Sequence, residues 1–182
     1  MIWLLNYNLI YELPNQKESV DIMKAIVIYY SNSGRTEKLA MRIQKVFHCE
    51  AVKVEPDKAY GGYLAAVARV GTEKIRKTVP KYHAPEVDFS KYDTIFVGYP
   101  IWYSSVPSFL LDYLKKQDLN GKTVIPFATS GGGNIEVTLK SLKSSVEDAE
   151  IRYPYNYGKS SEDRDDFKEW AKKVAAWAKK EE

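Results

Sequence analysis

The chain has 182 residues, which is about the length of one domain. Its 27 basic and 24 acidic residues leave a net charge of +3, too balanced to predict a nucleic-acid-binding protein. No apolar run approaches the ~20 residues that cross a bilayer, so no membrane span is expected. Cys49 is the single cysteine, which excludes an internal disulfide framework and fits a reducing compartment, the cytoplasm.

The first 22 residues differ from the rest of the chain. Met1 to Leu13 is apolar and aromatic, but no positive charge precedes it and no small-residue cleavage site follows it, so it is not typical of a signal peptide. Two interpretations stay open for residues 1–22. They are an upstream start or expression artefact, with Met23 the natural beginning, or they are an arm that packs on the domain. The first is favoured, and residues 23–182 then form the domain.

From Lys24 onward, strand-like and helix-like segments alternate about five times. Apolar or alternating runs predict strands at 25–30, 51–54, 94–99, 123–128 and 151–155. Apolar residues at helical spacing predict helices at 39–47, 63–79, 107–116, 135–146 and 167–178. In the second of these helices we expect Leu64, Val67, Ala68 and Ile75 to form the packing face. Pro126 fits poorly inside a central strand, because it lacks an N–H group.

This alternation predicts an α/β fold with a parallel sheet covered by helices on both faces. The first, third and fourth strands are continuously apolar and should be central. The second and fifth are more polar and should lie at the edges. The expected order is therefore 2-1-3-4-5, a doubly wound sheet whose ligand sits at the carboxyl ends of its strands.

The loop after the first strand is rich in small polar residues. It consists of Ser31, Asn32, Ser33, Gly34, Arg35 and Thr36. Unpaired N–H groups and the helix dipole attract anions at a helix start, and three hydroxyls add further donors. The spacing matches neither the P-loop nor the dinucleotide fingerprint. The loop therefore predicts a phosphate site, with a well-capped polar turn as the alternative.

Two further loops leave the same edge of the sheet. The loop at 98–107 contains Trp102 and Tyr103, large rings at a place that water should reach, which suits a flat ligand. The alternative is that both rings fold back into a small core. The loop at 129–134 contains three consecutive glycines, which indicates close approach of backbone to a ligand or else a flexible surface turn.

The three loops together make the chain resemble the flavodoxin family, and in particular flavodoxin-like proteins with a G-x-P-I-W-[WY] loop. The resemblance rests on S-x-S-G-x-T at 31–36, on the Gly98–Tyr103 loop and on the Thr129–Gly132 turn, and it covers residues 23 to about 180. It implies a flavodoxin-like three-layer sandwich and noncovalently bound FMN.

The resemblance also implies roles for individual residues. The hydroxyls of Ser31, Ser33 and Thr36 would hold the 5′-phosphate, together with the backbone from Asn32 to Thr36, which includes Gly34 and Arg35. Trp102 or Tyr103 would stack on the flavin ring. The ring edge would meet the backbone of Pro100, Ile101, Trp102, Tyr103, Thr129, Ser130, Gly131 and Gly132. Tyr155 or Tyr157 are candidates to cover the second face.

Three functions remain open on the sequence. The first is a flavodoxin-type electron carrier that serves a redox partner protein, and the second is an FMN-dependent NAD(P)H or quinone oxidoreductase. The third is a non-redox protein of the same fold. The chain departs from the acidic electron-carrying flavodoxins, because residues 23–182 carry a net charge of +5 once Lys17 and the three acids of the extension are set aside. No membrane or nucleic-acid partner is expected.

Overall fold

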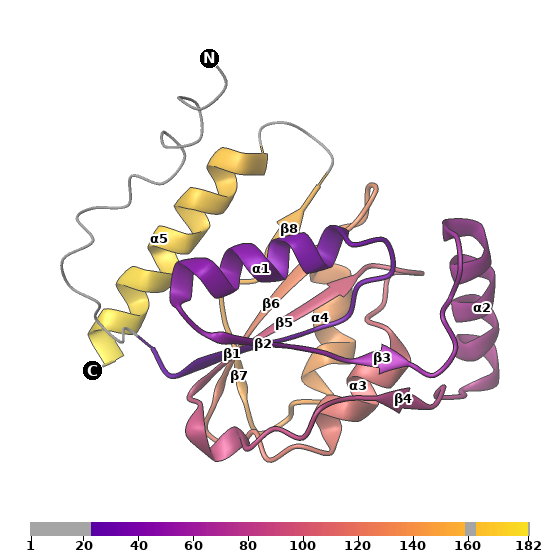
Figure 1. Ribbon diagram of the computed structural model, residues 1–182, viewed down its shortest axis with the longest axis horizontal. Coiled ribbons are helices and arrows are strands. Elements are labelled where there is room, and N and C mark those ends of the chain that lie inside the picture. The colour runs from indigo at the N-terminus through magenta and orange to yellow at the C-terminus, as the bar shows by residue number, and fades with distance from the viewer. Residues whose placement is uncertain (1–22, 159–162, 182) are drawn as a thin grey trace, which may run out of the picture.

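A computed structural model describes residues 23–158 and 163–181. The interpretations of residues 1–22 lie outside this part of the chain. A six-stranded, parallel sheet runs through the middle of the molecule (Figure 1) in the order β2-β1-β5-β6-β7, with β8 also paired to β6. Its strands are β1 Ala25–Tyr29, β2 Glu50–Lys53, β5 Thr94–Pro100, β6 Thr123–Thr129, β7 Glu150–Ile151 and β8 Tyr155–Tyr157. The predicted order is confirmed.

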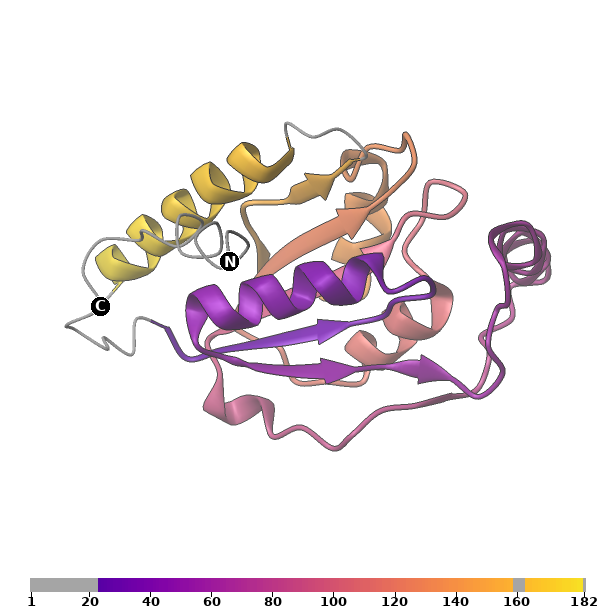
Figure 2. The ribbon, with the colours of Figure 1, turned by 45° about the horizontal axis from the view of Figure 1, so that its top comes forward.

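Helices cover both faces of the sheet. They are α1 Arg35–Phe47, α2 Tyr63–Arg76, α3 Ser108–Lys115, α4 Glu136–Lys143 and α5 Asp163–Glu181, with a short 3-10 turn, η2, at Phe89–Lys91. Helices α1 and α5 lie on one face and α3 and α4 on the other, whereas α2 stands at one end of the molecule (Figures 1 and 2). Among the described residues, no helix is long and apolar enough to cross a membrane.

Each face of the sheet has its own apolar core, because successive strand residues point to opposite sides. In β1, Val27 packs with Ile43 of α1 and Val174 of α5. Its neighbour Ile28 packs on the other face, in the core that contains Leu110 of α3 and Leu142 of α4. Strands buried on both faces must be apolar throughout, which explains why the central strands could be predicted from their continuous apolar runs.

The fifth strand is interrupted, where an unbroken strand at 151–155 is predicted. It consists of β7 and β8, separated by residues 152–154. Arg152 N donates to the carbonyl of Val124, and Ser130 N donates to that of Tyr157. The backbone N–H and C=O groups of the even-numbered residues of β6 therefore point toward the fifth strand, at this edge of β6. Pro126 faces the same edge and has no N–H to offer. Residues 152–154 lie between β7 and β8 beside Pro126, so the sheet does not need a hydrogen bond from the proline there.

Helix α2 extends from a small strand pair that the sequence patterns do not predict. Strands β3 Glu55–Pro56 and β4 Tyr82–His83 pair in antiparallel fashion, and the chain between them carries α2. The predicted packing face of α2 is wrong for Leu64, Ala68 and Ile75, whereas Val67 is half-buried and packs against the core. Leu64 is 81% exposed and Ile75 is 85% exposed, while the buried residues are Ala66 and Val70. Helical spacing identifies residues that share a face but does not say which of two apolar faces meets the body.

The buried tyrosines predict a loss of stability in alkali. Burial raises the pKa of Tyr113 to about 12, and burial with the nearby Glu37 carboxylate raises the pKa of Tyr29 to about 12. The pKa of Tyr99 is raised further by burial. Because the unfolded chain releases these protons near pH 10, stability is fully present below that pH and is lost as pH rises toward 12.

The measurement is the free energy of unfolding in urea at several pH values between 8 and 11.5. We expect a plateau followed by a steep fall above about pH 10, and Tyr99→Phe should flatten that fall because it removes one ionisable group. A free energy that is constant across the range would contradict the prediction.

Candidate functional site

Three loops meet at the carboxyl edge of the sheet, following β1, β5 and β6. Two hydrogen bonds join them. The hydroxyl oxygens of Thr36 and Thr129 lie 2.8 Å apart, and Ile101 N donates to the carbonyl of Thr129 at 3.0 Å. The structure therefore brings the sequence-predicted residues of all three loops to one place.

The first loop leaves hydrogen-bond donors without partners. Ser31 is only 8% exposed, and its Oγ makes no hydrogen bond within the described part of the chain. Gly34 precedes α1 with φ of 81°, a left-handed backbone that favours glycine, and no side chain caps the helix there. The first N–H groups of α1 are thus uncapped beside a buried, unpartnered hydroxyl. This donor set suits a phosphate group.

The other polar side chains of this loop differ in their surroundings. Ser33 is exposed, and Thr36 is buried against Thr129. The Asn32 amide donates to the carbonyl of Gly61 and accepts from the hydroxyl of Tyr30. Asn32 therefore anchors a neighbouring segment to the loop.

That neighbouring segment, residues 57–62, was missed by the sequence reasoning. Tyr60 is buried at 3% exposed, and Gly61 has φ of 73°. The segment lies beside the first loop through the Asn32 bond, so its bare glycines border the candidate site. The Gly61-Gly62 pair immediately before a helical pattern is the signal that could have indicated it.

In the second loop, the two candidate stacking residues have opposite surroundings. Trp102 is 6% exposed and lies among Tyr30, at 5.9 Å between ring centroids, and Tyr60, at 5.1 Å. Tyr103 is 52% exposed and sits in a tight turn with φ of 47°. Trp102 is thus a core residue beneath the loop, and Tyr103 is the ring that a ligand can reach.

The third loop combines buried hydroxyls with bare backbone. Thr129 and Ser130 are buried, and Ser130 Oγ donates to the carbonyl of Gly133 at 2.7 Å, which closes the turn. An added Cβ at Gly132 would meet nothing within 4 Å, and Gly132 is not among the left-handed glycines of the described chain. The fold itself therefore does not require glycine at 132, which leaves room for a ligand to approach its backbone.

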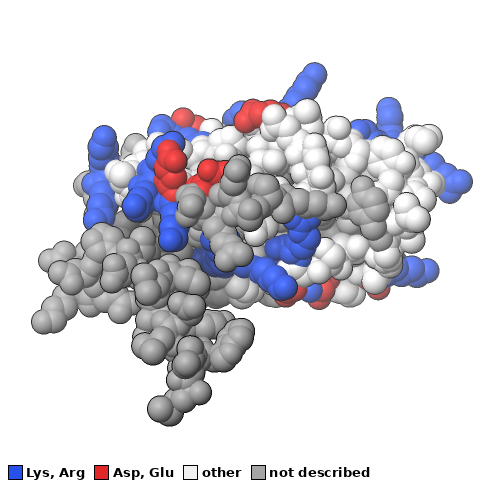
Figure 3. Space-filling model, turned by 90° about the horizontal axis from the view of Figure 1, so that it is seen from above, with Lys and Arg blue, Asp and Glu red and all other residues white. Residues whose placement is uncertain are grey.

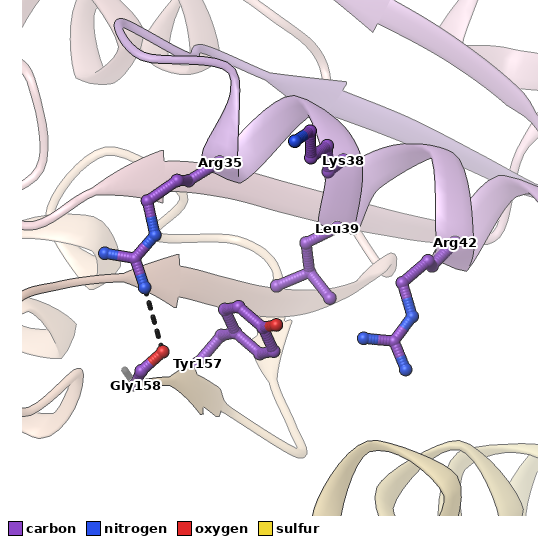
Figure 4. Close-up of a pocket in the computed structure, with 6 residues that line it drawn as sticks. All are labelled: Arg35, Lys38, Leu39, Arg42, Tyr157 and Gly158. Carbon is purple, nitrogen blue, oxygen red and sulfur yellow. Dashed lines mark hydrogen bonds between the residues drawn. The ribbon is translucent and has the colours of Figure 1, made fainter. Parts of the chain in front are cut away.

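Arg35 turns away from the first loop. Its guanidinium donates to the carbonyl of Gly158 at 2.9 Å and to that of Ser130 at 3.4 Å, so its side chain fixes the third loop to the segment after β8. Figure 4 shows this arrangement, with Arg35, Leu39 and Arg42 directed from α1 toward the Tyr157–Gly158 segment. Only the backbone of Arg35 remains available to the first loop.

A cavity of about 480 Å³ lies beside Arg35. Its lining residues are Arg35, Lys38, Leu39, Arg42, Tyr157 and Gly158 (Figure 4). Three of these carry positive charge, so the cavity attracts anions. Tyr157 borders this cavity, whereas Tyr155 is buried and stacks on Trp170 at 5.0 Å between centroids. Tyr155 therefore cannot cover a flavin.

Cys49 lies far from this edge, at the start of β2, and we expect it to be unreactive. Burial raises the pKa of its thiol to about 12, so very little thiolate exists at pH 8. Iodoacetamide should alkylate Cys49 slowly in the native protein and quickly in 6 M guanidinium. Equal rates would contradict this prediction. Within the described residues, no group of three His, Cys, Asp or Glu side chains is placed to hold a metal ion.

The doubly wound sheet and the site at its carboxyl edge define a flavodoxin-like protein. A family model described as Flavodoxin matches residues 24–174, and the chain therefore belongs to the flavodoxin family. The family assignment supports FMN as the predicted cofactor. No curated protein matches the chain.

Solved structures extend this result. A protein of Bacteroides uniformis assigned as a flavoprotein is 28% identical, with a TM-score of 0.72 over 82% of this chain and 98% of that one. One from Bacteroides eggerthii is 26% identical, with a TM-score of 0.71 over 84% and 98%. A Lactobacillus acidophilus flavoprotein solved in complex with FMN is 21% identical, with a TM-score of 0.65 over 82% and 99%. The last of these bears on the fold alone.

Proposed function

We propose that this chain binds FMN noncovalently and acts as a flavodoxin-type redox protein. The observation that carries the proposal is the buried Ser31 hydroxyl, which has no partner in the described chain and lies beside the uncapped start of α1. A buried hydroxyl without a partner is costly, and a phosphate oxygen would satisfy it together with the free N–H groups.

Each loop then has a role toward the cofactor. The backbone of Asn32–Thr36 and the Ser31 hydroxyl would hold the phosphate, and Tyr103 would lie against the ring. The backbone of the Pro100–Tyr103 and Thr129–Gly132 segments would line the ring edge. When bound, FMN supplies the redox chemistry, and the residues of the site position it and exclude water from one side.

The test is titration of the purified, flavin-free chain with FMN and, in parallel, with riboflavin. We expect FMN to bind with quenched fluorescence and at least tenfold more tightly than riboflavin, because only FMN has the phosphate. Equal affinities would contradict the phosphate site. A chain that binds neither flavin would be a non-redox protein of this fold.

A second candidate function, an FMN-dependent NAD(P)H oxidoreductase, is favoured by the cationic cavity between α1 and the Tyr157–Gly158 segment. Its positive charges suit the phosphates of a nicotinamide dinucleotide. Anaerobic mixing of the FMN-loaded chain with NADPH distinguishes the two functions. Rapid bleaching of the flavin band by NADPH, slowed in Lys38→Ser, would support the enzyme. If neither NADPH nor NADH bleaches the flavin band, the result would support an electron carrier that a partner protein reduces.

A further inference from the structure

Helix α2 presents an apolar stripe that is exposed except at Gly71, where the ring of Tyr103 lies against it. Leu64, Ala68, Gly71 and Ile75 are spaced four, three and four residues apart, so they share one face of the helix. Leu64 and Ile75 are more than 80% exposed, and Ala68 is exposed. The stripe therefore has the spacing of a buried helix face, yet most of it is exposed.

The opposite side of α2 is held to the 57–62 segment by side-chain contacts, so the inner and outer faces of the helix are distinct. Arg69 donates to Glu73 at 2.8 Å and to the carbonyl of Lys58 at 2.7 Å, and it lies over the Tyr60 ring at 4.2 Å. The Tyr60 hydroxyl donates to Glu73 at 2.7 Å. These contacts, with buried Ala66 and Val70, fix which face of α2 points outward.

The stripe continues onto the second loop of the candidate site. The ring of Tyr103 lies against Gly71, where an added Cβ would come within 3.1 Å of it. Lys74 Nζ donates to the carbonyl of Tyr103 at 3.0 Å. A partner on the stripe would therefore also touch the exposed Tyr103 ring.

The charges around the stripe have one sign. Lys74, Arg76 and Lys77 are exposed beside it, and Glu73, the one acid of α2, is paired with Arg69 and Tyr60. In Figure 3 the end of the molecule where α2 lies is largely uncharged, with Lys and Arg side chains projecting at its margin. An apolar strip with a cationic border is complementary to an apolar strip with an acidic border.

We propose that the outer stripe of α2 and Tyr103 form a docking surface for an acidic protein partner, which contributes apolar side chains flanked by carboxylates. A second copy of this chain fits less well, because the one acid of α2, Glu73, is already paired and would leave Lys74, Arg76 and Lys77 without carboxylates to meet. A membrane fits less well because Ala68 and Gly71 occupy the middle of the stripe, where an interfacial helix carries bulky residues. The small, exposed side chain of Ala68 lets a partner helix approach closely. The proposal goes beyond flavin binding, and Tyr103 is the one residue that it shares with the proposed flavin site.

The test uses the full chain, with and without FMN, and two fluorescein-labelled helical peptides. Both peptides carry Leu at i, i+3, i+4 and i+7, and one is flanked by Glu and the other by Lys. Fluorescence anisotropy should show the acidic peptide binding, with at least tenfold weaker binding in Leu64→Ser/Ile75→Ser and in 0.5 M salt. The acidic peptide should bind both with and without FMN, and more weakly with FMN, because Tyr103 then lies against the flavin. Val137→Ser, which removes an exposed apolar residue of α4, should bind like the unchanged protein.

Circular dichroism and flavin affinity should be unchanged in the double variant, because both side chains are exposed. Several results would overturn the proposal. These are no binding of the acidic peptide, equal binding of the basic peptide, or undiminished binding by the double variant. A dimer in sedimentation that the double substitution dissociates would assign the stripe to a second copy. Co-sedimentation with phosphatidylcholine–phosphatidylglycerol vesicles that it abolishes would assign the stripe to a membrane.

Discussion

Trp102→Ala is expected to lower the free energy of unfolding by about 3–5 kcal/mol, the usual cost of removing a large aromatic side chain from a core. Trp102 is almost completely buried, and its ring contacts those of Tyr30 and Tyr60. Tyr60 in turn lies under Arg69 of α2. The substitution therefore removes the centre of the cluster that joins the second loop, the 57–62 segment and α2.

Urea unfolding of the flavin-free chain measures this effect, and two further variants separate it from flavin binding. Trp102→Phe keeps an aromatic ring in the cluster and should recover part of the lost stability. Tyr103→Ala removes an exposed ring and should change stability by less than about 1 kcal/mol while it weakens FMN binding. If Trp102→Ala left stability unchanged and weakened only FMN binding, Trp102 would be a ligand-stacking residue after all.

Most of the fold could be predicted because the relevant patterns are local. Continuous apolar runs such as Ala25–Tyr29 identify central strands, and the order of the strands follows from the more polar runs at the two edges. The interruption between β7 and β8 depends on which edge of β6 Pro126 faces, and that is set by register between strands. A single sequence does not contain this information.

The candidate site was predictable in its loops but not in its individual side chains. Ser31 and Trp102 both occupy loops, yet both are buried, and Trp102 is covered by residues far away in the sequence. Its ring partners are Tyr30, which directly follows β1, and Tyr60 of the 57–62 segment. The same limitation explains α2, whose two apolar faces are equivalent in sequence until the contacts of Arg69 and Tyr60 distinguish them.

Ser31→Ala is expected to weaken FMN binding about tenfold to a hundredfold, and to leave riboflavin binding unchanged. A hydrogen bond to a charged phosphate contributes about 1.5–3 kcal/mol, and the Ser31 hydroxyl has no partner among the described residues that it would otherwise lose. For that reason the stability of the flavin-free chain should not fall. Fluorescence titrations give the affinities for FMN and for riboflavin, and urea unfolding gives the stability of the flavin-free chain.

Ser145→Ala is the matched control for this experiment. Ser145 is half-buried and donates to the carbonyl of Ser141 at the end of α4, away from the three loops. Its substitution should leave both flavin affinities unchanged. A Ser31→Ala chain that binds FMN as tightly as the unchanged protein would show that the buried hydroxyl does not meet the phosphate. A parallel loss of riboflavin affinity would instead indicate that Ser31 supports the shape of the loop, because riboflavin has no phosphate to lose.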